Sequence, residues 1–268
     1  MSGSLEIREG TFIGDLPYLV LGSGEPLVYL CGGTPNHRNP NPGLEQTMTL
    51  RTVKPLARAG FTVYFTNRWP GMAPDITFAE VARRHAEAIR RYFGGPVDVL
   101  GHSTGGSLTL QLIADEPDVV RKAVVASAAY TLGPVAKRSY RDLLHAIETN
   151  GRFAAEALLE GMVRSRWIRV VLTPLLRVAS RRITIENPTD TVAMLCAEYA
   201  FDVRNRLGDI PIETLVICGA QDYFWTPEMF AETAFRMPRG QLIMYPNRGH
   251  SVVTAPEFVR DVTAFLRS

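Results

Sequence analysis

Residues 97–114 constrain the fold of this chain more than any other part of its sequence. Residues 97–100 form a short, largely apolar run that is typical of a buried strand, and residues 107–114 are apolar almost all round, as expected of a helix inside a core. Between them lies the segment Gly101-His102-Ser103-Thr104-Gly105. The chain must therefore pass from a buried strand into a buried helix through a tight turn, which favours an α/β fold.

Steric crowding explains why glycine occupies the positions two before and two after Ser103. A serine held in strained dihedral angles brings neighbouring backbone close, so the positions two before and two after it tolerate almost no side chain. The pattern Gly-x-Ser-x-Gly between a strand and a helix resembles the nucleophile elbow of the α/β-hydrolase family. The resemblance implies that Ser103 is a nucleophile and that the backbone N–H of Thr104 points at an anion formed beside it.

Composition and charge exclude several function classes. Apolar residues make up 46% of the 268 residues and charged residues 21%, which is ordinary for a globular protein with a sizeable core. The 29 Lys and Arg against 27 Asp and Glu leave a formal charge of +2, which argues against a nucleic-acid partner. The first residues, Met1 to Glu6, lack a secretory pattern, and no stretch is long enough to span a membrane. We therefore expect a cytoplasmic protein without an integral membrane segment.

Motifs for metals and cofactors are also missing. Cys31, Cys196 and Cys218 have no Cys-x-x-Cys spacing and lie in apolar runs, so we expect buried structural thiols. There is no His-Glu-x-x-His, no Walker-type loop and no Gly-x-Gly-x-x-Gly after a strand. The sequence therefore predicts no metal and no cofactor.

The order of elements indicates a mostly parallel sheet with helices on both faces. An antiparallel pair of strands is expected over residues 10–20. Further strands are expected at residues 27–30, 62–66, 97–100, 123–126, 214–218 and 241–245, with helices between them. Residues 78–93 form a strongly amphipathic helix, on whose apolar stripe His85 is expected to be a hydrogen-bonded core histidine.

The alternation of predicted strands and helices stops after residue 129. Residues 130–187 contain helical runs and no strand-like run, and Pro174 interrupts one of the helical runs, over residues 164–182. In the α/β-hydrolase family a helical cap is inserted at this place over the serine. The resemblance therefore implies a core domain of residues 1–129 and 188–268 and a helical cap of residues 130–187.

Two more residues match the family by position. Asp222 follows the strand at residues 214–218, between Gly219 and Pro227, and matches the family's acid turn. His250 follows the last strand and precedes a terminal amphipathic helix, where the family has its base. The chain order Ser103, Asp222, His250 is the order of the family's catalytic triad.

The resemblance also implies an oxyanion hole. In the family the strand corresponding to residues 27–30 usually ends in a His-Gly pair, and the following residue supplies the second N–H donor. Here the pair is Cys31-Gly32, so Gly33 is the implied donor beside Thr104. After the next strand, Asn67-Arg68-Trp69-Pro70-Gly71 keeps one glycine of the family's Asp-x-x-Gly-x-Gly pattern. Arg68 and Trp69 are candidate substrate contacts, together with His102, Tyr223 and Trp167.

These residues predict a serine hydrolase that cleaves a carboxylic ester or thioester of a small molecule with an apolar portion. His250 would take the proton of Ser103 and return it to the leaving group, while Asp222 holds the imidazole in the useful tautomer. The same residues would also suit a hydrolase of C–C or amide bonds, an acyltransferase or a cofactor-free perhydrolase. A ligand-binding receptor that has lost turnover and a scaffold with a vestigial site remain alternatives. Substrate, oligomeric state and pathway cannot be inferred from the sequence.

One segment of the expected cap is unusual in its charge. Residues 161–185 carry six arginines and no acidic residue, interleaved with apolar residues, and the apolar side is expected to cover something. The arginines are then solvated, or turn toward an anionic group of the substrate, or contact an anionic membrane. The arginines are Arg164, Arg166, Arg169, Arg177, Arg181 and Arg182.

Overall fold

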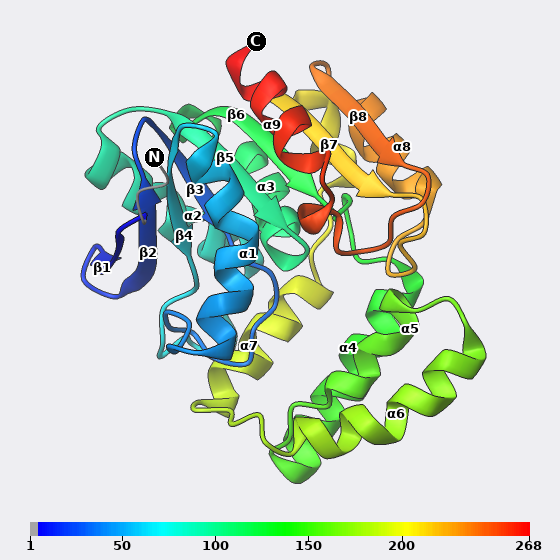
Figure 1. Cartoon of the computed structure of the whole chain (residues 1–268). Helices are drawn as coiled ribbons and strands as arrows, with labels where there is room; N and C mark the ends of the chain where they lie inside the picture. The colour runs from blue at the N-terminus through cyan, green and yellow to red at the C-terminus, as the bar shows by residue number, and fades with distance from the viewer. Residues whose placement is uncertain (1–4) are drawn as a thin grey trace.

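A twisted sheet of eight strands forms the centre of the molecule, as the computed structural model, which describes residues 5–268, shows (Figure 1). The strand order is β1-β2-β4-β3-β5-β6-β7-β8, in which the pairs β1–β2 and β2–β4 are antiparallel and the other five pairs are parallel. The strands are β1 (Ile7–Phe12), β2 (Leu16–Gly22), β3 (Glu25–Leu30), β4 (Phe61–Thr66), β5 (Val97–His102), β6 (Val120–Ala126), β7 (Glu213–Gly219) and β8 (Gly240–Tyr245).

Nine α-helices are found within residues 5–268, together with four short 3₁₀ turns. The helices are α1 (Leu44–Arg58), α2 (Phe78–Phe93), α3 (Thr104–Asp115), α4 (Pro134–Asn150), α5 (Leu159–Met162), α6 (Arg166–Ser180), α7 (Pro188–Tyr199), α8 (Pro227–Arg236) and α9 (Phe258–Arg267). The 3₁₀ turns are η1 (Pro117–Val119), η2 (Ala155–Leu158), η3 (Arg204–Asp209) and η4 (Val252–Thr254). None of the helices is long and apolar enough to cross a membrane.

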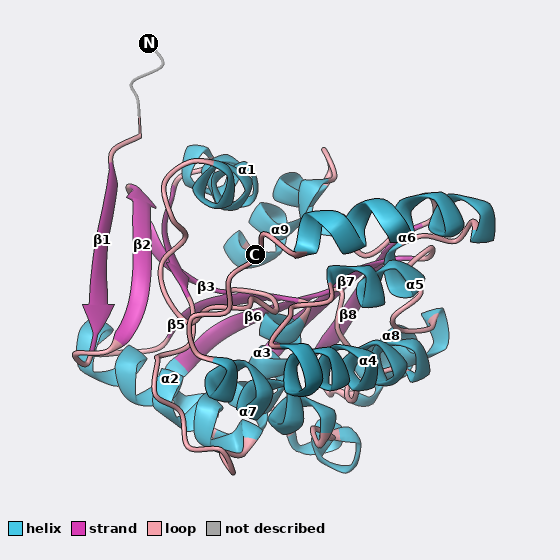
Figure 2. Ribbon diagram, turned by 90° about the horizontal axis from the view of Figure 1, so that it is seen from below, coloured by secondary structure: helices cyan, strands magenta, loops and turns pink. Residues whose placement is uncertain are grey.

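Successive side chains of the parallel strands point to opposite faces of the sheet, so the hydrophobic core is divided into two parts, one on each face. Leu27 and Tyr29 of β3 pack with α1 and α9 on one face, whereas Val28 and Leu30 pack with α2, α3 and α8 on the other (Figure 2). These strands are buried on both faces, which explains their continuous apolar sequences. The predicted parallel sheet with helices on both faces is confirmed.

Helices α4 to α6 leave the sheet between β6 and β7 and lie beyond the carboxyl ends of the parallel strands (Figure 1). Gly151 ends α4 in the left-handed conformation, with φ at 60°. Helix α7 returns the chain to the sheet and contacts both α4 and α2. We call residues 130–187 the helical insertion.

Three local expectations were wrong. Pro174 does not interrupt α6, because a proline inside a helix removes a single hydrogen bond and the remaining ones carry the helix through. Cys196 is exposed, because it lies on the outer side of α7, while Cys31 and Cys218 are buried as predicted. The outer apolar side of α6 covers nothing within residues 5–268, and Trp167 is 81% exposed. By contrast, His85 is the expected core histidine, since its Nδ1 is 2.9 Å from the carbonyl oxygen of Val81.

Candidate active site

Ser103 lies in the tight turn between β5 and α3 and has strained backbone angles, with φ at 56° and ψ at −123°. The flanking glycines permit this turn. A Cβ atom at position 101 would collide with the carbonyl group of Gly105, and one at position 105 with the carbonyl group of Leu30. The steric reason given for the two glycines is therefore confirmed.

The structure brings Ser103, His250 and Asp222 together, although 147 residues separate the serine from the histidine. Nε2 of His250 is 3.0 Å from Oγ of Ser103, and its Nδ1 is 2.8 Å from Oδ2 of Asp222. The other carboxylate oxygen, Oδ1, accepts a hydrogen bond of 2.9 Å from the N–H of Phe224. The side chain of Asp222 is completely buried, and that of His250 is nearly so. A buried carboxylate on Nδ1 favours the tautomer whose Nε2 accepts a proton.

Aromatic rings and two hydrogen bonds fix the position of His250. Its ring stacks on Trp225 at 5.8 Å and meets the edge of Phe224 at 4.7 Å. Its carbonyl oxygen accepts a hydrogen bond of 2.7 Å from Oγ of Ser127 and one of 3.2 Å from Nε2 of His102. Burial, together with the nearby His250, lowers the pKa of His102 to about 3. His102 is therefore neutral at neutral pH and holds the loop of His250 as a hydrogen-bond donor.

Two glycines lie beside the serine on the other side. Gly32 faces the Cβ of Ser103, and Gly33 faces the Oγ1 of Thr104. Both glycines line the same cavity as Ser103. Within residues 5–268 the backbone N–H groups of Gly33 and Thr104 donate to no protein acceptor. Gly33 and Thr104 therefore lie beside Ser103, and their role as oxyanion donors stays a prediction.

Arg68 supports the loop that carries Gly33. It is 2% exposed, and its Nη1 donates to the carbonyl oxygens of Cys31 at 3.2 Å and Gly32 at 2.8 Å. Its Nη2 donates to Oγ1 of Thr34 at 3.2 Å. A planar guanidinium holds several acceptors in fixed directions, so Arg68 sets the orientation of the peptide that precedes the Gly33 N–H.

A cavity of about 230 Å³ lies over Ser103. It is smaller than the ~300–1,000 Å³ of most drug-sized ligand pockets, which favours a small substrate or a small part of a larger one. Its walls are mostly apolar, and the helical insertion supplies Ala136, Tyr140, Leu143, Phe153, Leu158 and Met162. From α7 and the acid turn come Met194, Leu195, Phe224 and Trp225.

One polar cluster at the cavity was missed by the sequence analysis. The hydroxyl group of Tyr140 is 3.2 Å from Oγ1 of Thr104 and donates to Oε2 of Glu198 at 2.6 Å. Burial raises the pKa of Glu198, against the opposing effect of the hydrogen bond from Tyr140. No sequence signal marks Glu198, because its burial at 1% exposure depends on how α7 packs against α4.

The predicted substrate contacts are only partly at the cavity. His102 and Arg68 line it. Trp69 lies instead against Arg84, whose guanidinium carbon is 5.8 Å from the centre of the Trp69 ring. Tyr223 does not line the cavity, whereas the next two residues, Phe224 and Trp225, do. Trp167 lies on the exposed side of α6. None of these three side chains lines the cavity, because tertiary packing, not sequence distance from the triad, decides which side chains reach it.

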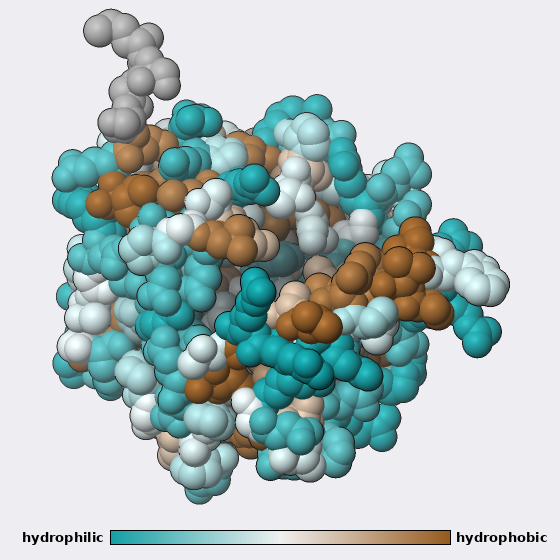
Figure 3. Space-filling model, turned by 60° about the horizontal axis from the view of Figure 1, so that its bottom comes forward, coloured by the Kyte–Doolittle hydropathy of each residue, from teal (hydrophilic) through white to brown (hydrophobic). Residues whose placement is uncertain are grey.

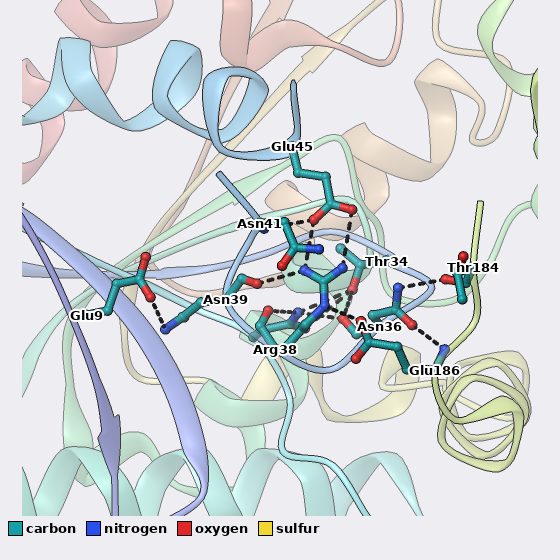
Figure 4. Close-up of polar contacts among 10 residues, drawn as sticks. Glu9, Thr34, Asn36, Arg38, Asn39, Asn41, Glu45, Thr184 and Glu186 are labelled. Carbon is teal, nitrogen blue, oxygen red and sulfur yellow. Dashed lines mark hydrogen bonds and ion pairs between the residues drawn. The ribbon is translucent and has the colours of Figure 1, made fainter. Parts of the chain in front are cut away.

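The loop after β3 joins the core to the end of the helical insertion (Figure 4). Asn36 donates to the carbonyl oxygen of Thr184 at 2.8 Å and accepts from the N–H of Glu186 at 2.7 Å. Arg38 binds Glu186 and Glu45 at 2.6 and 2.8 Å. Because Gly33 and Thr34 open the same loop, these contacts fix the helical insertion relative to Gly33.

Comparison with known proteins places the chain in a family. The model of the alpha/beta hydrolase family matches residues 42–262. RutD of Caulobacter vibrioides, for which carbamate hydrolysis is the suggested activity, is 26% identical over 75% of this chain and 81% of its own. The (E)-2-((N-methylformamido)methylene)succinate hydrolase of Acinetobacter baylyi is 25% identical over 90% of both chains.

The solved structures show the same fold. A hydrolase from Pseudomonas aeruginosa PA01 is 22% identical, covers all of both chains and superposes with a TM-score of 0.74. Because the family model covers most of the chain, and the sheet, the turn at Ser103 and the fold all agree with it, this chain belongs to the alpha/beta hydrolase family.

Proposed function

We propose that this chain is a serine hydrolase that cleaves a carboxylic ester or thioester, with Ser103 as nucleophile, His250 as general base and acid, and Asp222 as the residue that orients His250. One observation carries the proposal: the hydrogen-bonded series from Asp222 through His250 to Ser103, with spacings of 2.8 and 3.0 Å. A serine hydroxyl is a poor nucleophile until a base within hydrogen-bond reach accepts its proton.

In the first step Oγ of Ser103 attacks the carbonyl carbon while its proton moves to Nε2 of His250. The carbonyl oxygen becomes an oxyanion, which the N–H groups of Gly33 and Thr104 stabilise by roughly 3 kcal/mol each in a preorganised site. His250 then protonates the leaving group as the bond to the acyl carbon breaks. Water repeats the same steps on the acyl-enzyme and restores Ser103.

The cavity supports a substrate with a small apolar acyl group. Leu143, Phe153 and Leu158, which belong to the helical insertion, give it apolar lining. We propose that the insertion acts as a cap that excludes water and selects the acyl group by shape.

A second candidate is hydrolysis of an amide or C–C bond by the same residues. The names of the relatives favour it, since one is named for a methylformamido compound and another, from Dechloromonas aromatica, for 2-hydroxy-6-oxononadienedioate. The second relative is 24% identical over 98% of this chain and 94% of its own. The difference between the candidates lies in the leaving group that His250 must protonate.

The test is a substrate panel with the purified protein. It compares short-chain aryl esters, acyl thioesters, anilides and a vinylogous 1,5-diketone, with Ser103→Ala as the inactive variant and the exposed Ser251→Ala as a matched control. We expect steady turnover of the ester or thioester, loss of it in Ser103→Ala and no change in Ser251→Ala. Undiminished ester hydrolysis in Ser103→Ala would contradict the proposal. Turnover of the diketone or anilide alone would favour the second candidate.

A further inference from the structure

Helix α6 presents an apolar face to solvent. Of the eleven large apolar side chains that are highly exposed within residues 5–268, six belong to this one helix of 15 residues, with exposures between 51 and 81%. They are Trp167, Ile168, Val170, Val171, Leu175 and Val178. Scattered exposed apolar residues are normal, but a contiguous cluster indicates an interaction surface.

The helix is apolar on two sides. Its inner side, which includes Leu172, Leu176 and the buried Ser180, packs on η2 and α5. Oγ of Ser180 donates to Glu156 of η2 at 3.2 Å. The exposed face is a second apolar stripe along the helix, because Trp167, Val170 and Val171 have the spacing i, i+3 and i+4 of residues on one side of a helix. The exposed residues are therefore not displaced core residues, because the core side of the helix is already occupied.

Positive charge borders this face. Arg166, Arg177 and Arg181 lie near one edge of it on a helical projection, and all three are exposed, while Arg177 also pairs with Glu156 at 3.3 Å. The helical insertion as a whole carries ten Lys and Arg against five Asp and Glu, a formal charge of +5, whereas the entire chain carries +2. Figure 3 shows the face as a brown area at one edge of the molecule, with hydrophilic side chains beside it.

We propose that the exposed face of α6 docks on an anionic lipid surface. An apolar stripe that inserts at the level of the headgroups, flanked by arginines whose stems lie along it and whose heads reach phosphates, is the arrangement of an interfacial helix. The charge decides between this partner and a second copy of the chain. A two-fold contact through the same face would bring together two helical insertions that each carry a formal charge of +5, while anionic headgroups attract this charge.

Docking in this orientation sets the cavity near the lipid. Met162, which is 48% exposed, belongs to α5 against which α6 packs, and it also lines the cavity over Ser103. The docking site itself does not depend on the proposed catalytic function.

The test is cosedimentation of the full-length Ser103→Ala protein with vesicles of phosphatidylcholine alone or mixed with phosphatidylglycerol. Using Ser103→Ala separates lipid binding from hydrolysis, so failure of the docking surface leaves the proposed function untouched. We expect binding to the mixed vesicles, weaker in high salt, and little binding to phosphatidylcholine. Trp167→Ser should lower the partition coefficient at least about tenfold, and Arg181→Gln about fivefold. The matched control is Phe235→Ser, since Phe235 is 72% exposed on α8, and it should bind like the parent.

Three results would overturn the proposal. Absence of binding to the mixed vesicles would do so, as would equal losses in Trp167→Ser and Phe235→Ser. A concentration-dependent dimer in light scattering that Trp167→Ser abolishes would show that a second copy covers the face instead.

Discussion

Replacing Asp222 by asparagine tests how the carboxylate acts on His250. Oδ1 of Asp222 accepts the N–H of Phe224, so in Asp222→Asn the amide oxygen keeps that position and the amide NH₂ group faces Nδ1 of His250. The opposite orientation would set two donors against each other at the Phe224 N–H. Because the NH₂ group can only donate, Nδ1 must accept, and the imidazole proton moves to Nε2, which can then no longer take the proton of Ser103.

The loss should be large. The same change of tautomer in another serine-histidine-aspartate enzyme lowers kcat by about ten-thousand-fold, which corresponds to about 5.5 kcal/mol of transition-state stabilisation. The assay is steady-state hydrolysis of an aryl ester, with thermal unfolding as the control that the near-isosteric variant is folded. Asp222→Ala leaves Nδ1 without a partner and both tautomers accessible, so Asp222→Asn should be no more active than Asp222→Ala. An asparagine variant that keeps more than about a tenth of the wild-type kcat would refute the tautomer argument.

The other predictions concern the wall of the cavity, the Gly33 loop and acid stability. Gly161→Ala should lower kcat, because the added Cβ collides with the ring of Phe224, whereas Gly208→Ala, where a Cβ meets nothing within 4 Å, should be silent. Arg68→Met should lower kcat about a hundredfold with little change in KM and weaken binding of a boronic acid that mimics the tetrahedral intermediate. Burial lowers the pKa of His85 to about 4, so the unfolded state binds more protons below about pH 6.5 and stability falls as the pH falls. At pH 5 the neutral His85 should lower the free energy of unfolding, measured by urea unfolding, by about 2 kcal/mol. A His85→Gln variant should not show this part of the pH dependence.

Each of these three has a result that contradicts it. A Gly161→Ala variant with wild-type kcat would show that the ring of Phe224 can move without disturbing His250. A rise in KM with unchanged kcat in Arg68→Met would make that residue a ground-state substrate contact. An unchanged slope of stability against pH in His85→Gln would mean that the histidine is not neutral in the folded protein.

The sheet and the turn at Ser103 could be predicted because they depend on local sequence, whereas Asp222 and His250 could be selected only through the resemblance to the α/β-hydrolase family. Strands that are buried on both faces read as continuous apolar runs, and a parallel sheet collects the residues that follow them at one edge. The glycines around Ser103 could be interpreted in the same way, because the turn itself forbids a Cβ atom at those positions.

The walls of the cavity could not be predicted. Trp167 was expected at the substrate, but the face of a helix that turns inward depends on its packing partners, and α6 turns its other side toward η2. The same holds for Tyr223, whose place at the cavity is taken by Phe224 and Trp225. Glu198 lies on a helix that the sequence marks only as apolar, and its contact with Tyr140 joins residues 58 positions apart.

The central claim is that Ser103 carries the acyl group during turnover, and mass spectrometry of the acid-quenched enzyme during hydrolysis of an aryl ester tests it most directly. We predict a mass increase equal to the acyl group, located on the peptide that contains Ser103, which forms and decays at least as fast as kcat and is absent from Ser103→Ala. An adduct on another residue, or hydrolysis of the ester by Ser103→Ala at the wild-type rate, would contradict the claim.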